Sequence, residues 1–254
     1  MNKMDAHDLF SKKSGLYARV RPHYPEELFQ YLESICEEHK SAWDAACGNG
    51  QAAVSLARYF KEVQASDISE QQIAHAKQNP KVIYSVQPVE ETSFAQDQFD
   101  LVCVAQALHW FDFDLFWPEV KRVLKLGGIF AAWGYTWFSI EDSIDEWIRE
   151  KILRIIEPYW AQQIKLLLDR YQDVPFPFVR LETPEIRMIM SWDLNQLFAY
   201  LQSWSATRLC KEERGNDFLL EAYQAVRSEW GNENKKKAVE MEFFMLVGRN
   251  DNNP

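Results

Sequence analysis

The chain has 254 residues, a formal net charge of −10, an apolar fraction of 47% and an aromatic fraction of 14%. This supply of apolar side chains is sufficient for a core, so the composition excludes a wholly disordered chain. The negative charge repels phosphate backbones and therefore disfavours a nucleic acid partner.

The sequence also carries no signal for a membrane or a metal. No apolar run is long enough to span a bilayer, and the N-terminal segment has no apolar signal core. The four cysteines form no Cys-x-x-Cys pair and show no zinc-type spacing, so we expect no metal ligands. Buried free thiols are typical of a reducing compartment. We therefore expect a cytoplasmic protein, monomeric or homodimeric, with no membrane partner.

Strands and helices are expected to alternate in the first half of the chain. Pro25, followed by two glutamates, predicts the start of a helix over 25–39, and Ser69 is expected to cap a later helix. An alternating order of this kind predicts a parallel sheet with right-handed crossovers. The expected strands are 41–46, 62–66, 82–86, 99–105 and 129–133, and the further helices are 51–60, 70–78 and 116–124, the last ended by Gly127 and Gly128.

The pattern changes after Gly134, where apolar residues recur at helical spacing and prolines interrupt the chain. We expect helical structure over 142–171, 194–204 and 217–230, with strands over 179–190 and 240–248. The predicted fold is α/β, a Rossmann-like doubly wound seven-stranded mostly parallel sheet with helical cap insertions. The chain is expected to form a single domain, with an N-terminal lid or arm at 1–24, a ligand-binding core at 25–134, a cap and substrate region at 135–235, and a final strand and tail at 236–254.

The turn after the first expected strand holds the strongest signal. Gly48 and Gly50 stand two residues apart, and the small residue Ala53 follows three residues later. Asp67 lies at the expected end of the second strand. Glycines let backbone approach an adenosine-containing ligand, and a carboxylate at that position suits ribose hydroxyls. A glycine turn alone is also common for packing reasons, so its neighbours decide the interpretation.

Three segments together resemble class I S-adenosylmethionine-dependent methyltransferases over about residues 41–133. Asp44 to Gly50 (Asp-Ala-Ala-Cys-Gly-Asn-Gly) is similar to the first motif of that family, Val89-Glu90 to its third-strand loop, and Leu124 to Gly128 to its Leu-Lys-Pro-Gly-Gly turn. More narrowly, three segments resemble the subgroup that includes trans-aconitate methyltransferases. These are residues 17–25, 105–112 and 200–206.

The resemblance implies S-adenosylmethionine as cofactor and assigns residues to it. Asp67 would accept the ribose hydroxyls, and adenine would rely on backbone at Val89 and on Glu90, because Pro88 stands where many relatives carry an acid. Arg21 would pair with the cofactor carboxylate or a substrate anion. The full implied set is Tyr17, Arg21, Asp44, Ala46, Cys47, Gly48, Gly50, Asp67, Ile68, Val89, Glu90 and Ala105. Ala46 replaces the first glycine of the family motif, and its methyl group asks for an ordinary φ.

The residues that would contact the methyl acceptor are harder to predict from the sequence. His109 follows the fourth strand and is expected to orient a substrate oxygen, to act as a base, or to be structural, and Trp110 is expected to shape the pocket wall. Trp133, Trp137 and Trp204 are candidates for an apolar substrate pocket. Arg187 and Arg208 are candidate anchors for a carboxylate.

The hypothesis is therefore a methyltransferase that acts on a small-molecule methyl acceptor at a carboxylate or hydroxyl oxygen. The absence of Asp-Pro-Pro-Tyr after the fourth strand disfavours amine methylation of DNA bases. Two alternatives stay open at this point: a nicotinamide-dependent oxidoreductase that uses the same glycine turn, and a non-enzymatic module that only binds S-adenosylmethionine.

Overall fold

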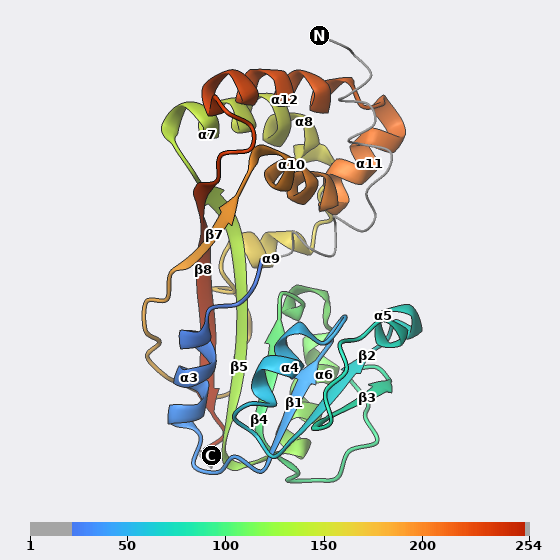
Figure 1. Ribbon diagram of the computed structural model, residues 1–254. Coiled ribbons are helices and arrows are strands. Elements are labelled where there is room, and N and C mark those ends of the chain that lie inside the picture. The colour runs from blue at the N-terminus through green and yellow to red at the C-terminus, as the bar shows by residue number, and fades with distance from the viewer. Residues whose placement is uncertain (1–21, 252–254) are drawn as a thin grey trace. The chain divides into compact units, whose positions relative to one another are not determined.

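The computed structural model describes residues 22–251 (Figure 1). Within this part the chain divides into two compact units. The first, here called the sheet unit, contains residues 24–136, 163–188 and 242–251. The second, here called the helical unit, contains residues 137–162 and 189–241 together with residues 22–23. The single-domain organisation expected from the sequence stays a prediction.

The strands of the described chain form one eight-stranded sheet in the order β3-β2-β1-β4-β5-β8-β6, with β7 paired to β8. Pairing from β3 through β5 is parallel, and β6 runs antiparallel to β8. This confirms the predicted Rossmann-like, mostly parallel fold. The strands are β1 (Ser41–Ala45), β2 (Glu62–Asp67), β3 (Val82–Val86), β4 (Phe99–Ala105), β5 (Leu124–Ser139), β6 (Val179–Arg180), β7 (Met188–Trp192) and β8 (Lys237–Arg249).

Three helices of the sheet unit begin within one residue of their predicted starts, at residues 26, 51 and 70, whereas α6 begins at Phe113 and not at the predicted residue 116. Pro25 is the N-cap of α3, and the Ser69 hydroxyl accepts a hydrogen bond from the Gln72 N–H at the start of α5, as expected for a capping serine. The α6 helix is capped by the Asp112 side chain. The helices are α3 (Glu26–Ile35), α4 (Gln51–Leu56), α5 (Glu70–Ala74), the 3-10 helix η1 (Leu108–Trp110), α6 (Phe113–Val123) and α9 (Ile164–Leu168).

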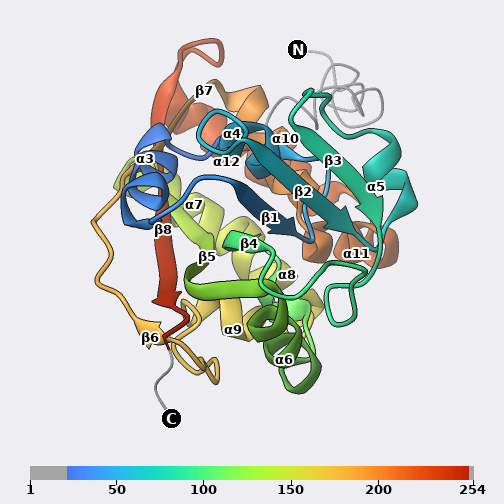
Figure 2. The same cartoon turned by 90° about the horizontal axis from the view of Figure 1, so that it is seen from below.

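Helices cover both faces of this sheet. Alternate strand residues divide between two core clusters, with Leu101 and Cys103 of β4 in one and Val102 and Val104 in the other. The first cluster includes residues of α3 and α4, and the second includes residues of α6 and α9. Figure 2 shows these helix pairs on opposite sides of the strands. A strand covered on both faces needs apolar side chains in both directions, which explains why β4 is almost entirely apolar.

Two local predictions are wrong in detail. Gly127 and Gly128 do not terminate α6, which ends at Val123, but lie inside β5. There Gly127 N–H donates to the Asn250 carbonyl, and the Gly128 carbonyl accepts from Asn250 N–H. The strand expected over 179–190 is two short strands, which makes eight strands in place of seven. Pro184 lies in the gap and lacks the N–H that a ladder needs.

The helical unit contains most of the remaining helices. The expected helix over 142–171 is continuous only to Tyr159, and it includes a π-helical segment, η2. The predicted helix over 217–230 is confirmed, whereas α11 was not expected. The elements are α7 (Asp142–Ile148), η2 (Arg149–Leu153), α8 (Arg154–Ile156), the 3-10 helix η3 (Glu157–Tyr159), α10 (Leu194–Ser203), α11 (Ser205–Arg214) and α12 (Asp217–Trp230). No helix in residues 22–251 has the length and apolar composition needed to cross a membrane.

Candidate functional site

The turn between β1 and α4 is the centre of the candidate site. Cys47 N–H donates to the carbonyl of Ser66 on the neighbouring strand at 2.9 Å, and Gly50 N–H donates to Cys47 O at 2.9 Å. Gly50 is the N-cap of α4, at φ 78°. The carboxyl ends of β1, β2 and β4 are adjacent in this parallel sheet, and open α/β sheets bind their ligands at this edge.

Asp67 is tied directly to the turn. One carboxylate oxygen accepts from Gly48 N–H at 2.8 Å, and the other accepts from Ser69 N–H at 2.8 Å. A carboxylate has about four acceptor positions. The side chain therefore keeps acceptor capacity for about two further donors after holding the turn, which matches the two hydroxyls of a ribose.

The two glycines of the turn have different surroundings. At Gly48, φ is 53° and no heavy atom of residues 22–251 lies within 4 Å of the place a Cβ would take, so among these residues this side of the turn is open to a ligand. At Gly50, a Cβ would lie 2.1 Å from the Tyr84 Oη atom. The hydroxyl of Tyr84 donates to the Lys77 carbonyl at 2.6 Å, which holds the ring against the turn. The missing side chain at Gly48 thus leaves space for a ligand, and the missing side chain at Gly50 leaves space for the Tyr84 ring.

Ala46 corrects one expectation. It lies at φ 55°, in the left-handed region, and not at the ordinary φ that its methyl group favours. This conformation costs an L-residue about 1–2 kcal/mol. The turn therefore has the backbone of a glycine at a position where the chain has alanine, and the contacts of Cys47 and Gly48 with β2 hold it there.

Asp44 contacts the helix that follows the turn. Its side chain is fully buried, and one oxygen accepts from Ala53 N–H in the first turn of α4 at 2.8 Å. The Cys103 thiol donates to the other oxygen at 3.7 Å. Burial raises the pKa of the Asp44 carboxyl to about 7. Cys47 is also buried, and burial raises the pKa of its thiol, so this cysteine is not a reactive thiolate. The structure thus assigns Asp44 a supporting contact with α4.

The other residues expected at the cofactor differ in exposure. Ile68, directly after Asp67, is 77% exposed, and an apolar side chain in that position can cover a flat ring. Val89 is buried, and Glu90 is half-buried and accepts from Asp112 N–H at 3.5 Å. Ala105 ends β4 at the same sheet edge. Tyr17 and Arg21 lie outside the described residues.

The pair His109–Trp110 divides into a buried and an exposed side chain. His109 is buried, and its Nδ1 atom lies 3.3 Å from the Tyr171 hydroxyl, with the two rings stacked. Burial lowers the pKa of His109 to about 4, so the ring is neutral at pH 7. Trp110 is 55% exposed. Of the two, Trp110 is the side chain available to a ligand.

Gln106 is a residue that sequence reasoning missed. It follows β4 at φ 58°, an uncommon conformation for a residue other than glycine. Its side-chain amide donates to Tyr135 O at 3.0 Å and accepts from Tyr135 N–H at 3.2 Å, so it extends the pairing of β4 with β5 by one side chain. No short pattern in the sequence marks it, because its partner is 29 residues away.

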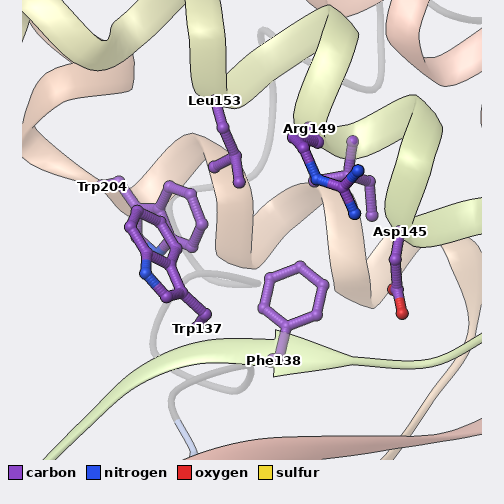
Figure 3. Close-up of a pocket in the computed structure, with 7 residues that line it drawn as sticks. Trp137, Phe138, Asp145, Arg149, Leu153 and Trp204 are labelled. Carbon is purple, nitrogen blue, oxygen red and sulfur yellow. The ribbon is translucent and has the colours of Figure 1, made fainter. Parts of the chain in front are cut away.

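The three tryptophans proposed for a substrate pocket lie in different places in the structure. Trp133 is fully buried in the core of the sheet unit. Trp137 and Trp204 line a cavity of about 290 Å³ within the helical unit (Figure 3). Neither Arg187 nor Arg208 lines this cavity; its arginine is Arg149, which the sequence did not single out. Among the described residues, no three His, Cys, Asp or Glu side chains are grouped to hold a metal ion.

The fold and this turn define a class I methyltransferase, and comparison with known proteins agrees. Residues 43–132 match a family model described as a methyltransferase domain. A Dictyostelium discoideum protein named as a methyltransferase is 30% identical over 251 residues, covering 96% of this chain and 95% of that protein. A Saccharomyces cerevisiae protein named as an S-adenosylmethionine-dependent methyltransferase is 25% identical over 229 residues, covering 76% of this chain and 79% of that protein.

A solved structure also shares the fold. The structure described as a type II methyltransferase from Anaeromyxobacter dehalogenans has a TM-score of 0.86 and 33% identity, covering 92% of this chain and 99% of that chain. The present chain belongs to the class I S-adenosylmethionine-dependent methyltransferase family. Its methyl donor is S-adenosylmethionine, and the family assignment decides against a nicotinamide-dependent oxidoreductase.

Proposed function

We propose that this methyltransferase acts on a small molecule at a carboxylate or hydroxyl oxygen, with the cofactor bound at the turn between β1 and α4. The observation that carries the proposal is the Asp67 carboxylate, which is fixed by Gly48 and Ser69 N–H groups and keeps acceptor positions for ribose hydroxyls. The finer resemblance to the trans-aconitate methyltransferase subgroup stays a prediction, as do the roles of the individual residues.

The residues present fit an adenosine-containing ligand. Space beside Gly48 admits the ligand close to the backbone, Asp67 accepts from the sugar, and the exposed Ile68 offers an apolar surface for the base. Glu90 lies on the loop after β3. When bound, S-adenosylmethionine supplies a methyl group on a positively charged sulfur, which an acceptor oxygen can attack while the sulfur keeps the bonding electron pair.

The protein itself has little covalent chemistry to perform. Its contributions are alignment of the acceptor with the methyl carbon and exclusion of water. A neutral, buried His109 suits a role in holding Tyr171 and η1 in place, which positions Trp110 at the surface of the sheet unit. In this proposal His109 is a positioning residue and not the base.

Isothermal titration with S-adenosylhomocysteine tests the cofactor site. Asp67→Ala should weaken binding by about 10- to 100-fold, because it removes hydrogen bonds to a charged acceptor worth about 1.5–3 kcal/mol. The matched control is Glu62→Ala, which removes an exposed acid at the opposite end of β2. Equal affinity for wild type and Asp67→Ala would refute the placement of the cofactor.

The acceptor requires a second measurement. Purified protein and S-adenosylmethionine are incubated with a panel of small carboxylic acids and alcohols, and methylated products are detected by mass spectrometry. Cleavage of the product by mild base identifies a methyl ester, and resistance identifies an ether. Methylation of nitrogen or carbon acceptors alone would contradict the proposed acceptor atom, and binding of S-adenosylhomocysteine without any product would favour a module that only binds the cofactor.

A further inference from the structure

The cavity of the helical unit has one aromatic and one charged side. Trp137 and Phe138 come from the end of β5, Trp204 lies between α10 and α11, and Asp145 and Arg149 come from α7 and the start of η2. In Figure 3 the two indoles lie on one side, the charged pair lies on the other, and Phe138 stands between them. Its volume of about 290 Å³ is at the small end of ligand pockets, about 300–1,000 Å³.

The aromatic side is held in place from behind. The rings of Trp204 and Trp137 are 6.3 Å apart at 70°, and those of Trp204 and Phe138 are 6.3 Å apart at 49°. Trp204 also packs against Trp160 and Tyr200 with ring centroids 5.8 and 5.5 Å away. Rings supported in this way lose little entropy on binding, so they form a preorganised surface for a flat, unsaturated body.

Of the two charged groups in the cavity, the Asp145 carboxylate bonds to backbone, whereas the Arg149 guanidinium makes no hydrogen bond within residues 22–251. Both Asp145 oxygens accept from Ile140 N–H at 3.1 Å, and burial raises the pKa of its carboxyl. Asp145 therefore stabilises the backbone before α7. Arg149 is exposed, and within residues 22–251 its guanidinium makes an ion pair with Glu146 at 4.0 Å, attracts the Asp145 carboxylate electrostatically and makes no hydrogen bond. Its donors are thus free for a ligand.

The backbone at Arg149 is itself unusual. Arg149 opens the π-helical segment that also contains Leu153, another residue of the cavity lining. Single π-helical turns inside α-helices are rare and occur frequently at functional sites. This segment follows α7 without interruption, so the irregular turn sets the direction in which Arg149 and Leu153 leave the helix.

We propose that this cavity binds a flat, unsaturated organic acid, with its body against Trp137, Phe138 and Trp204 and its carboxylate on Arg149. A guanidinium recognises a carboxylate through two parallel N–H donors. An organic cation would meet Arg149 as a like charge.

Three probes of nearly equal shape test the proposal on the full chain: cinnamate, cinnamamide and cinnamylamine, each titrated by calorimetry. Cinnamate should bind at least about tenfold more tightly than the amide, the effect of a charge-assisted hydrogen bond. Arg149→Gln should reduce cinnamate affinity to that of the amide and leave amide affinity unchanged. The matched control is Arg154→Gln, a neighbouring arginine that pairs with Glu150 at 2.5 Å and lies outside the lining.

Several results would overturn the proposal: equal binding of acid and amide, tighter binding of the amine, no binding of any probe, or an unchanged acid affinity in Arg149→Gln. Circular dichroism of each variant verifies that the fold is intact. S-Adenosylhomocysteine binding is measured on the same samples. For the unmodified chain, absence of cinnamate binding with intact S-adenosylhomocysteine binding rejects the cavity assignment alone. The reverse result rejects the proposed cofactor site and leaves the acid site standing.

Discussion

Substituting the two glycines of the cofactor turn by alanine should have unequal effects, because their surroundings differ. Both have left-handed φ values, 53° at Gly48 and 78° at Gly50. Within the described part of the chain, only the new Cβ at Gly50 meets an atom, the Tyr84 Oη at 2.1 Å, with the Cζ of the same ring at 2.8 Å. Gly48→Ala therefore measures backbone strain alone, and Gly50→Ala measures strain plus displacement of Tyr84.

The expected magnitudes follow from these contacts. Left-handed φ costs an alanine about 1–2 kcal/mol, and the lower entropy of the unfolded chain offsets about 0.4–1 kcal/mol of this. Gly48→Ala should thus lower the free energy of unfolding by about 1 kcal/mol. Moving Tyr84 adds an overpacking cost of about 1–3 kcal/mol and the loss of its hydrogen bond to Lys77, about 0.5–1.5 kcal/mol. Gly50→Ala should therefore lose about 2.5–5.5 kcal/mol.

Urea unfolding of both variants measures these differences, and a double variant identifies their cause. Tyr84→Ala removes the obstructing ring, so Gly50→Ala combined with Tyr84→Ala should lose clearly less stability than the sum of the two single changes. The stability losses of Gly48→Ala and Tyr84→Ala should simply add, because the Tyr84 ring does not lie within 4 Å of the Cβ position at Gly48. Equal losses for the two glycine variants, or additive losses for Gly50→Ala and Tyr84→Ala, would refute this reasoning.

Three further predictions concern buried titrating groups. Because burial raises the pKa of Asp44 from 3.8 to about 7, the folded state holds a proton that the unfolded chain releases, and the free energy of unfolding should fall as pH rises across this range. Asp44→Asn should flatten that slope in urea titrations. Burial alone would raise the pKa of Glu119, but hydrogen bonds from Arg122 and Thr92 outweigh it and lower the pKa below 4.5. Glu119→Gln should therefore cost about 1–3 kcal/mol at pH 7 and progressively less below pH 4.5, as thermal unfolding at several pH values would show. The lowered pKa of His109, about 4 against 6.5, predicts stability that is complete above pH 6.5 and is lost toward pH 4; an NMR titration that finds an ordinary histidine pKa would contradict its burial.

The sheet unit was largely predictable because its signals are short in sequence. Parallel strands covered on both faces have continuous apolar runs, and β4 was predicted with the bounds that the structure shows. The glycines and Asp67 lie at strand ends, and parallel pairing brings such ends to one edge. Asp67 and Gly48 are 19 residues apart, and the parallel pairing of β1 with β2 brings them within hydrogen-bonding distance.

Features that depend on distant partners were not predictable. Gly127 and Gly128 suggested a helix end, but their hydrogen bonds go to Asn250, which no local pattern announces. The left-handed φ of Ala46 runs against its residue type, because contacts with β2 outweigh a local preference of about 1–2 kcal/mol. The buried position of Asp44 is of the same kind, since the Cys103 that donates to it lies 59 residues away.

The cofactor site could be predicted from the sequence and the cavity of the helical unit could not, for a physical reason. The cofactor is the same throughout the family, so its binding residues lie on the turns that the fold itself brings together. The cavity of the helical unit is built from the end of β5, the junction of α7 with η2, and the residue between α10 and α11. Trp137 and Trp204 were candidates from the sequence. Whether the Arg149 guanidinium is open to a ligand depends instead on how close the nearby acids lie: Glu146 is 4.0 Å away, and Asp145 accepts hydrogen bonds from backbone. A cation without hydrogen bonds beside supported aromatic rings is a property of side-chain geometry, so the proposed acid site becomes visible only in three dimensions.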